Sequence, residues 1–258
     1  MQIAGSVALV TGANRGLGKC FVDALITRGA AKVYACARDT ASLTSLIDSY
    51  GDKIEAVSLD VTDDVSVSNA AKIAGDVTLL INNAGVLTRL GLIEAGNLEP
   101  LRQELEVNLY GVARMCLAFA PVLKKSKNNS AVVNMLSVGS LHGFAPFGTY
   151  CVSKAAAMSL TQSLRYELQE QGTSVHGVYA GLIATDMTEG IEDEMATPED
   201  IAGETLAGIE SGLLDIDTGE RAHAVRKLLM EENFDTIEQA YLDRAAGHYQ
   251  KHGKDGSA

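Results

Sequence analysis

The chain has 258 residues, of which 47% are hydrophobic and 21% charged, so it belongs with globular rather than mainly disordered proteins. Its 21 lysines and arginines against 33 aspartates and glutamates give a formal net charge of −12. This acidic balance excludes nonspecific nucleic-acid binding and disfavours attachment to an anionic membrane surface. Because an α/β domain can absorb this length, we expect residues 1–258 to form a single domain.

No segment of the sequence predicts a membrane or secretory destination. The longest apolar run, 112–123, contains Arg114 and is too short to cross a bilayer. The N-terminus lacks the basic region of a signal peptide, and the four cysteines show no CxxC spacing. We therefore predict free thiols and a cytoplasmic location.

Short apolar runs alternate with helix-patterned stretches along the chain. In order, the pattern predicts strand 7–10, helix 17–28, strand 32–37, helix 40–50, strand 54–59, helix 65–74, strand 77–81, helix 100–123, strand 131–135, helix 149–170, strand 175–179, helix 198–211 and a short strand 213–216. Apolar strands separated by helices indicate a parallel sheet covered on both faces. We predict a doubly wound, Rossmann-like α/β fold of about seven strands.

The pattern changes beyond the sixth predicted strand. A core of about residues 5–190 overlaps a loop of about residues 181–197, which we expect to contact the substrate. Two amphipathic stretches, 222–230 and 235–249, predict extra helices in a C-terminal segment of about residues 220–250.

A glycine cluster, Thr11-Gly12-Ala13-Asn14-Arg15-Gly16-Leu17-Gly18, lies between the first strand and the first helix. Glycine permits a tight turn and lets a pyrophosphate approach the backbone and the helix N-terminus. A glycine cluster can also merely end a strand, but the strand–turn–helix context favours a dinucleotide site.

The TGxxxGxG spacing of this cluster resembles that of the short-chain dehydrogenase/reductase family, in its shorter branch. Further matches are Asp60-Val61 after the third strand, Asn82-Asn83-Ala84-Gly85 after the fourth, and Ser137 followed by Tyr150 and Lys154 in a YxxxK pattern. The resemblance covers about residues 5–190. It implies a cofactor site formed by Gly12, Asn14, Arg15, Gly16, Leu17, Gly18, Arg38, Asp60, Val61, Asn83, Ala84, Gly85, Tyr150, Lys154, Gly181, Ile183 and Thr185. In the last of these segments Ala180 replaces the proline of the family's PGxxxT pattern.

The end of the second strand bears on the choice between NADP(H) and NAD(H). We place Ala37 at the position where a carboxylate would bind the ribose of NAD, with Arg38 next to it. Arg38 and Arg15 resemble the basic pair of NADP-preferring members, so NADP(H) is preferred and NAD(H) is kept as the alternative. Asp39 is interpreted as a helix cap rather than a ribose contact.

Tyr150 and Lys154 are four residues apart and share one helix face. A nearby ammonium favours the phenolate and lowers the pKa of tyrosine, which suits proton exchange with an alcohol or carbonyl oxygen. The resemblance makes Ser137 the residue that orients the substrate oxygen. It makes Asn108 the holder of a relay water, whereas an asparagine in mid-helix can also simply tie down a backbone kink.

These residues predict an oxidoreductase that acts on a small secondary alcohol, ketone or aldehyde. We expect Ser137, Tyr150, Leu87, Phe144 and Met187 to contact the substrate. Other candidates are Val138, His142, Phe147, Tyr179, Leu182, Ile191 and Met195. The histidines lack metal-ligand spacing, so no metal is expected. Cys151 is interpreted as packing, and Glu189, Glu192, Asp193, Glu194, Asp215 and Asp217 as solvated acids.

Two alternatives stay open at this point. A regulatory protein could bind the dinucleotide without turnover, because fold does not fix function. The sister branch of epimerases and dehydratases is the other alternative, although chain length and the TGxxxGxG spacing argue against it. The resemblance implies a homodimer through the helices that carry Asn108 and Tyr150, whereas the atypical C-terminus leaves a tetramer open.

Overall fold

The computed structural model describes residues 1–126 and 129–252 and contains one parallel sheet of seven strands. The strands lie side by side in the order β3-β2-β1-β4-β5-β6-β7. Their bounds are β1 Val7–Thr11, β2 Lys32–Ala37, β3 Ile54–Ser58, β4 Leu79–Asn82, β5 Ser130–Met135, β6 Thr173–Ala180 and β7 Asp215–Thr218. The predicted doubly wound fold is confirmed.

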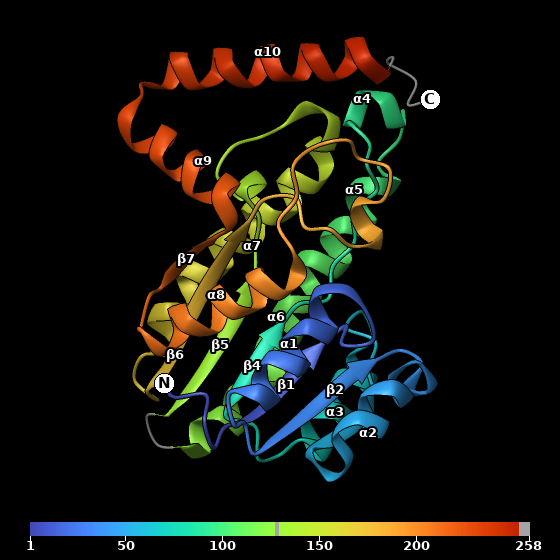
Figure 1. Cartoon of the computed structure of the whole chain (residues 1–258), viewed down its shortest axis with the longest axis vertical. Helices are drawn as coiled ribbons and strands as arrows, with labels where there is room; N and C mark the ends of the chain where they lie inside the picture. The colour runs from blue at the N-terminus through green and yellow to red at the C-terminus, as the bar shows by residue number, and fades with distance from the viewer. Residues whose placement is uncertain (127–128, 253–258) are drawn as a thin grey trace.

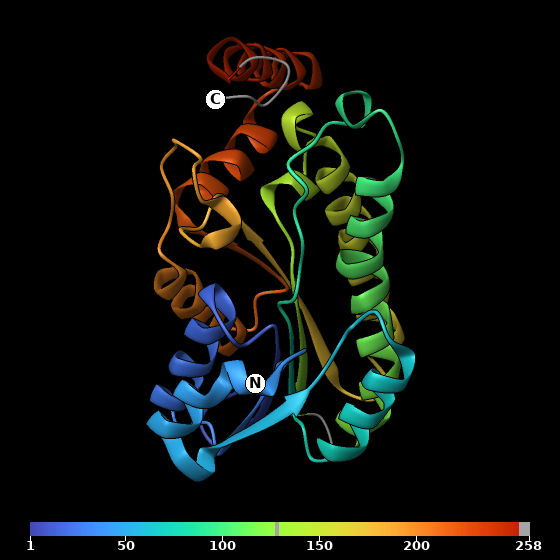
Figure 2. The ribbon, with the colours of Figure 1, turned by 90° about the vertical axis from the view of Figure 1, so that its right-hand side faces the viewer.

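Helices cover both faces of this sheet (Figures 1 and 2). One layer contains α1, α2 and α8, and the other contains α3, the α5–α6 run and α7. The helix bounds are α1 Gly16–Thr27, α2 Thr44–Tyr50, α3 Asp64–Ile73, α4 Leu92–Ala95, α5 Glu99–Leu105, α6 Val112–Leu123, α7 Gly148–Glu167, α8 Pro198–Glu210, α9 Gly219–Glu231 and α10 Phe234–His252.

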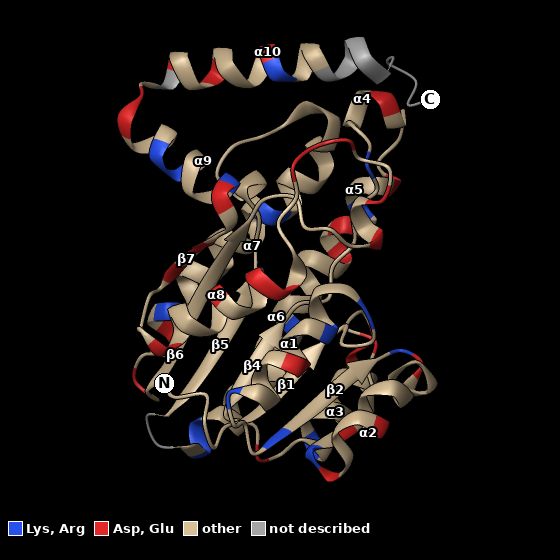
Figure 3. Cartoon of the chain, in the orientation of Figure 1, with Lys and Arg blue, Asp and Glu red and all other residues tan. Residues whose placement is uncertain are grey.

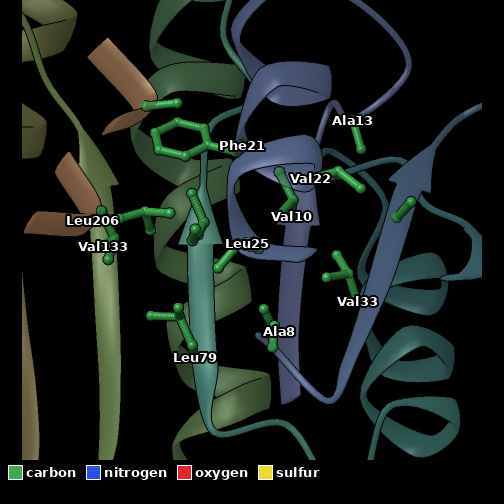
Figure 4. Packing of buried hydrophobic residues seen from close by; sticks show 14 of the residues in the cluster. Ala8, Val10, Ala13, Phe21, Val22, Leu25, Val33, Leu79, Val133 and Leu206 are labelled. Carbon is green, nitrogen blue, oxygen red and sulfur yellow. The ribbon is translucent and has the colours of Figure 1, made fainter. Parts of the chain in front are cut away.

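The alternation of side chains along each strand divides the core into two layers. Ala8 and Val10 of β1 point into the cluster under α1 and α8, whereas Leu9 points into the cluster under α3 and α6. Figure 4 shows the first cluster, in which Phe21 and Leu25 of α1 lie over the sheet. Strands buried on both faces explain why the sequence runs are apolar throughout.

The strand order reverses between β1 and β4, and this position determines where a ligand can bind. Connections leave β1 toward β2 on one side and β4 toward β5 on the other. The loops after β1 and β4 therefore diverge at the carboxyl edge of the sheet, which is where open α/β sheets bind ligands.

Several parts of the fold differ from the predicted elements: α4 was not predicted, and the predicted helix 40–50 begins as a 3₁₀ helix, η1 Thr40–Leu43. The predicted helix 100–123 contains a π-helical turn, η3 Glu106–Gly111, between α5 and α6. The seventh strand begins at Asp215 rather than 213, after a turn at Gly212 with φ of +74°. The expected C-terminal helices are present as α9 and α10, and α10 lies across the carboxyl end of the sheet (Figures 1 and 2).

One helical run of the described residues, Glu99–Ser126, is long and apolar enough by composition to span a membrane. Met115, Phe119 and Leu123 on this run are fully buried in the core cluster beneath α3 and α6. These contacts are those of a core helix. The four cysteines are free thiols, and three of them are buried.

Candidate active site

A cavity of about 810 Å³ opens at the carboxyl edge of the sheet. Every residue that the sequence predicts for the cofactor lines it, as do Ser137, Leu87, Phe144 and Met187. Of the other candidates, Val138, His142, Phe147, Leu182 and Ile191 also line it, but Tyr179 and Met195 do not. Tyr179 is wrongly predicted because it points into a small buried cluster with Leu136 and Ala157.

The glycine loop between β1 and α1 leaves space for phosphate groups. Gly12 has φ of +67°, in the left-handed region that favours glycine. A Cβ atom on Gly18 would lie 2.0 Å from the carbonyl oxygen of Gly12, so only glycine allows helix α1 to begin this close to the turn. No side chain caps the α1 N-terminus, and no acidic residue occupies its first turn. These features fit the pyrophosphate of a dinucleotide.

Thr11 ties this loop to the loop after β4. Its hydroxyl accepts hydrogen bonds from the backbone N–H groups of Asn83 and Ala84, each at 2.9 Å. The Asn83 amide donates to the carbonyl oxygen of Thr11 at 2.9 Å. This role of Thr11 does not follow from the glycine spacing, although its position at the end of β1, the neighbour of β4, was a usable signal.

The end of the cavity near β2 and β3 contains Arg38 and Asp60. The backbone N–H and the hydroxyl of Thr62 donate to Asp60, at 2.9 and 2.7 Å, and these bonds lower the pKa of its carboxyl group. Asp39 accepts from the backbone N–H of Ala41 at 2.9 Å, which is the predicted cap. Arg15 forms an exposed ion pair with Asp186 at 2.9 Å.

Tyr150 and Lys154 both face the cavity from one side of α7. Lys154 is buried, and its ammonium donates to the carbonyl oxygen of Met135 at 2.7 Å. Burial lowers the pKa of Lys154 to about 8. Its Nζ lies 5.7 Å from the centre of the Tyr150 ring.

The electrostatics of Tyr150 differ from the expectation of a lowered pKa. Desolvation raises the pKa of Tyr150, and a hydrogen bond with Ser137 opposes the rise only in part. The physical reason is that the Lys154 ammonium is directed to Met135 rather than to the phenol oxygen. In this state the phenol keeps its proton and can act as an acid.

Asn108 lies in the π-helical turn η3, is completely buried and is not among the cavity-lining residues. It accepts from the backbone N–H of Val86 and donates to the carbonyl oxygen of Val86, both at 2.9 Å. It also donates to the Ser153 hydroxyl at 2.9 Å. These contacts match the role of tying the helix turn to the loop after β4.

Glu104 and Arg89, which were not predicted from the sequence, also fix the loop after β4 in place. The backbone N–H and hydroxyl of Thr88 both donate to Glu104 at 2.8 Å, and Glu104 is fully buried on α5. Arg89 has φ of +60°, and its guanidinium donates to the carbonyl oxygens of Met187 and Glu189 at 2.6 and 2.8 Å. Glu104 lies four residues before Asn108, and this spacing, which puts both on one helix face, could have identified Glu104 from the sequence.

Helix α10 covers the substrate end of the cavity. The rings of Tyr241 and His142 stack with centroids 3.8 Å apart, and Glu238 lies 3.2 Å from Nε2 of His142. Arg244 lies over the ring of Phe144 at 5.6 Å. Arg244 also binds Asp193 of the loop after β6, so two walls of the cavity, the loops after β5 and β6, both contact α10.

Several residues interpreted as solvated or as packing have other environments. Asp193 is bound by both Arg221 and Arg244, at 3.0 and 2.9 Å. Asp215 and Asp217 form ion pairs with Arg165 and Arg226. Cys151 lines the cavity beside Gly139 as well as packing there, and burial raises the pKa of its thiol, which keeps it a poor nucleophile.

The sequence is similar to those of known enzymes. Residues 6–196 match the short chain dehydrogenase family. The chain is 34% identical over 236 residues to the 3-oxoacyl-acyl-carrier-protein reductase FabG of Vibrio cholerae serotype O1, covering 90% of this chain and 93% of that protein.

Two solved structures have the same architecture. One is a short chain dehydrogenase from Burkholderia cenocepacia in complex with NADP, with 35% identity, a TM-score of 0.87 and coverage of 95% of this chain and 99% of that one. The other is a 3-ketoacyl-(acyl-carrier-protein) reductase from Brucella melitensis complexed with NADH, with 26% identity, a TM-score of 0.77 and coverage of 85% and 99%.

Proposed function

Because the chain belongs to the short-chain dehydrogenase family of oxidoreductases, which act on CH–OH and C=O groups, we propose that it transfers a hydride between NADP(H) and a secondary alcohol, or its ketone or aldehyde. The observation that carries this proposal is that Ser137, Tyr150 and Lys154 line the same cavity as the glycine loop.

In the reductive direction Tyr150 donates its proton to the substrate oxygen, and Ser137 holds that oxygen by a hydrogen bond. The bound nicotinamide would supply the hydride to the carbonyl carbon. Desolvation keeps the phenol protonated before the reaction. Lys154, with its pKa lowered to about 8, then provides a positive charge that stabilises the phenolate and can return a proton to it.

The preference for NADP(H) over NAD(H) is supported by the residues near the end of β2. Arg38 lines the cavity there, and Ala37 brings no carboxylate to repel a 2′-phosphate. The only acid that follows directly, Asp39, is occupied as a helix cap. Arg15 would have to leave Asp186 to reach the same phosphate, and both partners are exposed enough to separate.

A homodimer through the helices that carry Asn108 and Tyr150, the η3–α6 run and α7, is part of the proposal. Leu117 on α6 is 77% exposed, and Tyr166 on α7 is 82% exposed. Tyr110 on η3 and Val152 on α7 are also more than half exposed, and η3 packs against both α6 and α7. Light scattering is expected to give twice the monomer mass, and a monomer at working concentration would contradict it. The cytoplasmic location and the single domain stay predictions.

The deciding experiment follows NADPH oxidation by the purified protein with a panel of aliphatic, aryl and cyclic ketones. Tyr150→Phe is expected to lower turnover by about 10²–10⁴-fold, the range for losing a general acid, while NADPH affinity changes little. Turnover that survives in the variant would exclude the Tyr150 mechanism. Tight NADPH binding without turnover of any ketone would favour the non-catalytic alternative, which the reductases among the relatives do not support.

A further inference from the structure

We infer that the substrate of this protein carries a carboxylate remote from its reacting carbon, and that Arg221 and Arg244 bind this carboxylate. The inference rests on the proposed oxidoreductase function and concerns the substrate class of the same cavity. Both arginines line the cavity, and both come from the C-terminal helices α9 and α10.

The position of Arg221 follows from the topology of the sheet. β6 and β7 are parallel neighbours with Ala180 opposite Thr218, so the residues after the two strands meet at the carboxyl edge. A Cβ atom on Gly181 would lie 2.8 Å from the Cβ and Cδ atoms of Arg221. The stem of Arg221 therefore lies directly on the loop 181–185, which the family resemblance places in the cofactor site. Arg244 reaches the cavity from α10, over the ring of Phe144.

The two guanidinium groups share one carboxylate. Each uses a single nitrogen to reach the same oxygen of Asp193. Arg226, on the same helix as Arg221, shows the contrast: both its Nε and its Nη2 bind Asp217, through three hydrogen bonds of 2.9–3.2 Å. A guanidinium has five N–H donors in a fork that fits a carboxylate. Arg226 is matched to its own carboxylate, whereas Arg221 and Arg244 have donors to spare.

The charge of the cavity differs from that of the chain. Its lining includes five basic residues (Arg15, Arg38, Lys154, Arg221 and Arg244) and four acidic ones (Asp60, Asp186, Glu192 and Asp193), whereas the whole chain has a net charge of −12. Among the residues that line the substrate end, Glu192 is the only acid besides Asp193, and it is exposed and forms no ion pair with any other described residue. Glu238, which lies 3.2 Å from His142, is not a lining residue. Solvent screens Glu192 more than it screens the half-buried Arg221. Figure 3 shows basic segments of α9 and α10, interspersed with acidic ones, above this edge of the sheet.

The remaining lining of this end is apolar, with Leu87, Phe147, Leu182, Met187 and Ile191. An apolar wall with a pair of guanidinium groups fits a hydrocarbon body that ends in an anion. The substrate class is therefore a keto acid, or the corresponding hydroxy acid, in which a hydrocarbon segment separates the two groups.

The test uses methyl ketones that carry a terminal carboxylate at increasing chain length, each paired with its neutral primary amide. The readout is the ratio of kcat/KM for the acid to kcat/KM for the amide, which cancels any general loss of activity. In the unmodified protein this ratio is expected to exceed about 10 at one or more lengths, the effect of one charged hydrogen bond.

Three variants and one control variant separate substrate binding from a purely structural clamp. Arg244→Gln and Arg221→Gln are each expected to lower the acid-to-amide ratio by about 10-fold. Asp193→Asn is expected to raise it, because the competing carboxylate is gone. Arg226→Gln, which removes a guanidinium from the same helix but outside the cavity lining, is expected to leave the ratio unchanged.

A ratio of one or less at every chain length would overturn the inference. So would an Asp193→Asn variant that shifts the ratio in the same direction as Arg244→Gln, which is the result for a clamp. If no ketone oxidises NADPH, the proposed function fails, and calorimetric Kd values of the NADP-loaded protein for alkanoates and their amides decide the inference separately. Tighter binding of the alkanoate supports the subsite, and equal binding overturns it.

Discussion

The two ends of the cavity are built in different ways. The cofactor end consists of backbone at the carboxyl ends of β1 and β4, with Gly12 and Gly18 where side chains would fill the space. The substrate end consists of side chains from several distant segments: the loops after β4, β5 and β6, and helices α9 and α10. A site made of backbone needs one short local motif, whereas a site made of side chains needs the whole fold. One added atom can therefore disrupt the cofactor end, whereas the substrate end depends on many weak contacts.

The largest effect is expected for Gly18→Ala, which tests the backbone end. The added Cβ would lie 2.0 Å from the Gly12 carbonyl oxygen and 2.7 Å from the Asn83 amide nitrogen. We expect NADPH affinity to fall by about 100-fold, because the loop must shift by more than the core tolerates. Gly203→Ala on α8 is the control, since a Cβ there meets no atom within 4 Å. It should keep NADPH affinity and gain about 0.5–1 kcal/mol of stability, and similar losses in both variants would contradict the comparison.

Lys154→Met is expected to make the protein more stable and inactive. The pKa of Lys154 falls from 10.5 to about 8 on folding, so keeping it charged costs stability. This cost is fully present below pH 8 and disappears as the pH rises toward 10.5, the value of the unfolded chain. The lowering of the Lys154 pKa corresponds to a loss of stability of at most about 3 kcal/mol. The hydrogen bond to Met135, which the variant loses, reduces the expected gain.

Urea unfolding without added cofactor measures this effect. At pH 7 the Lys154→Met variant should exceed the unmodified protein by about 1–3 kcal/mol in free energy of unfolding, and the difference should shrink above pH 8. If the difference in free energy of unfolding is the same at pH 7 and above pH 8, burial of the Lys154 ammonium does not lower the stability of the protein.

Arg38→Leu sharpens the comparison within the cofactor end. The cofactor end is built mainly of backbone, and Arg38 contributes an exposed side chain to it. We expect the Kd for NADPH to rise by about 10-fold and the Kd for NADH to change little. Arg102→Leu removes an exposed arginine of α5 that does not line the cavity, so it serves as the control. Equal weakening of both cofactors would show that Arg38 does not contact the 2′-phosphate.

The smallest effect is expected for Tyr241→Ala at the substrate end. The variant removes the ring that stacks on His142, a contact of about 0.5–1.5 kcal/mol. The KM for a ketone should rise by roughly 3- to 10-fold, with NADPH affinity unchanged. Leu242→Ala changes the exposed neighbouring residue on α10 and should leave the KM unaffected. A loss of NADPH affinity in Tyr241→Ala would show that the two ends are not separable.

Most of the fold and of the cofactor site could be predicted from local patterns. Strand 32–37 and the cap at Asp39 follow from apolar runs and side-chain chemistry within a few residues. The loop at Thr11–Gly18 is equally local. The π-helical turn at Asn108 could not be predicted, because bonds to Val86 and Ser153 hold it, from two other segments of the chain.

The sequence by itself determined the doubly wound sheet, the glycine loop and the shared helix face of Tyr150 and Lys154, because each depends on spacing along one or two elements. The family resemblance added Ser137 to this pair. Only the tertiary structure decided that Asp193 binds two arginines from α9 and α10, that Glu104 holds Thr88, and that Lys154 is directed to Met135. Partners that are 16 to 51 residues apart in the chain leave no periodic trace in it. Their hydrogen bonds and pKa values depend on distances and burial that exist only after the helices have packed on the sheet.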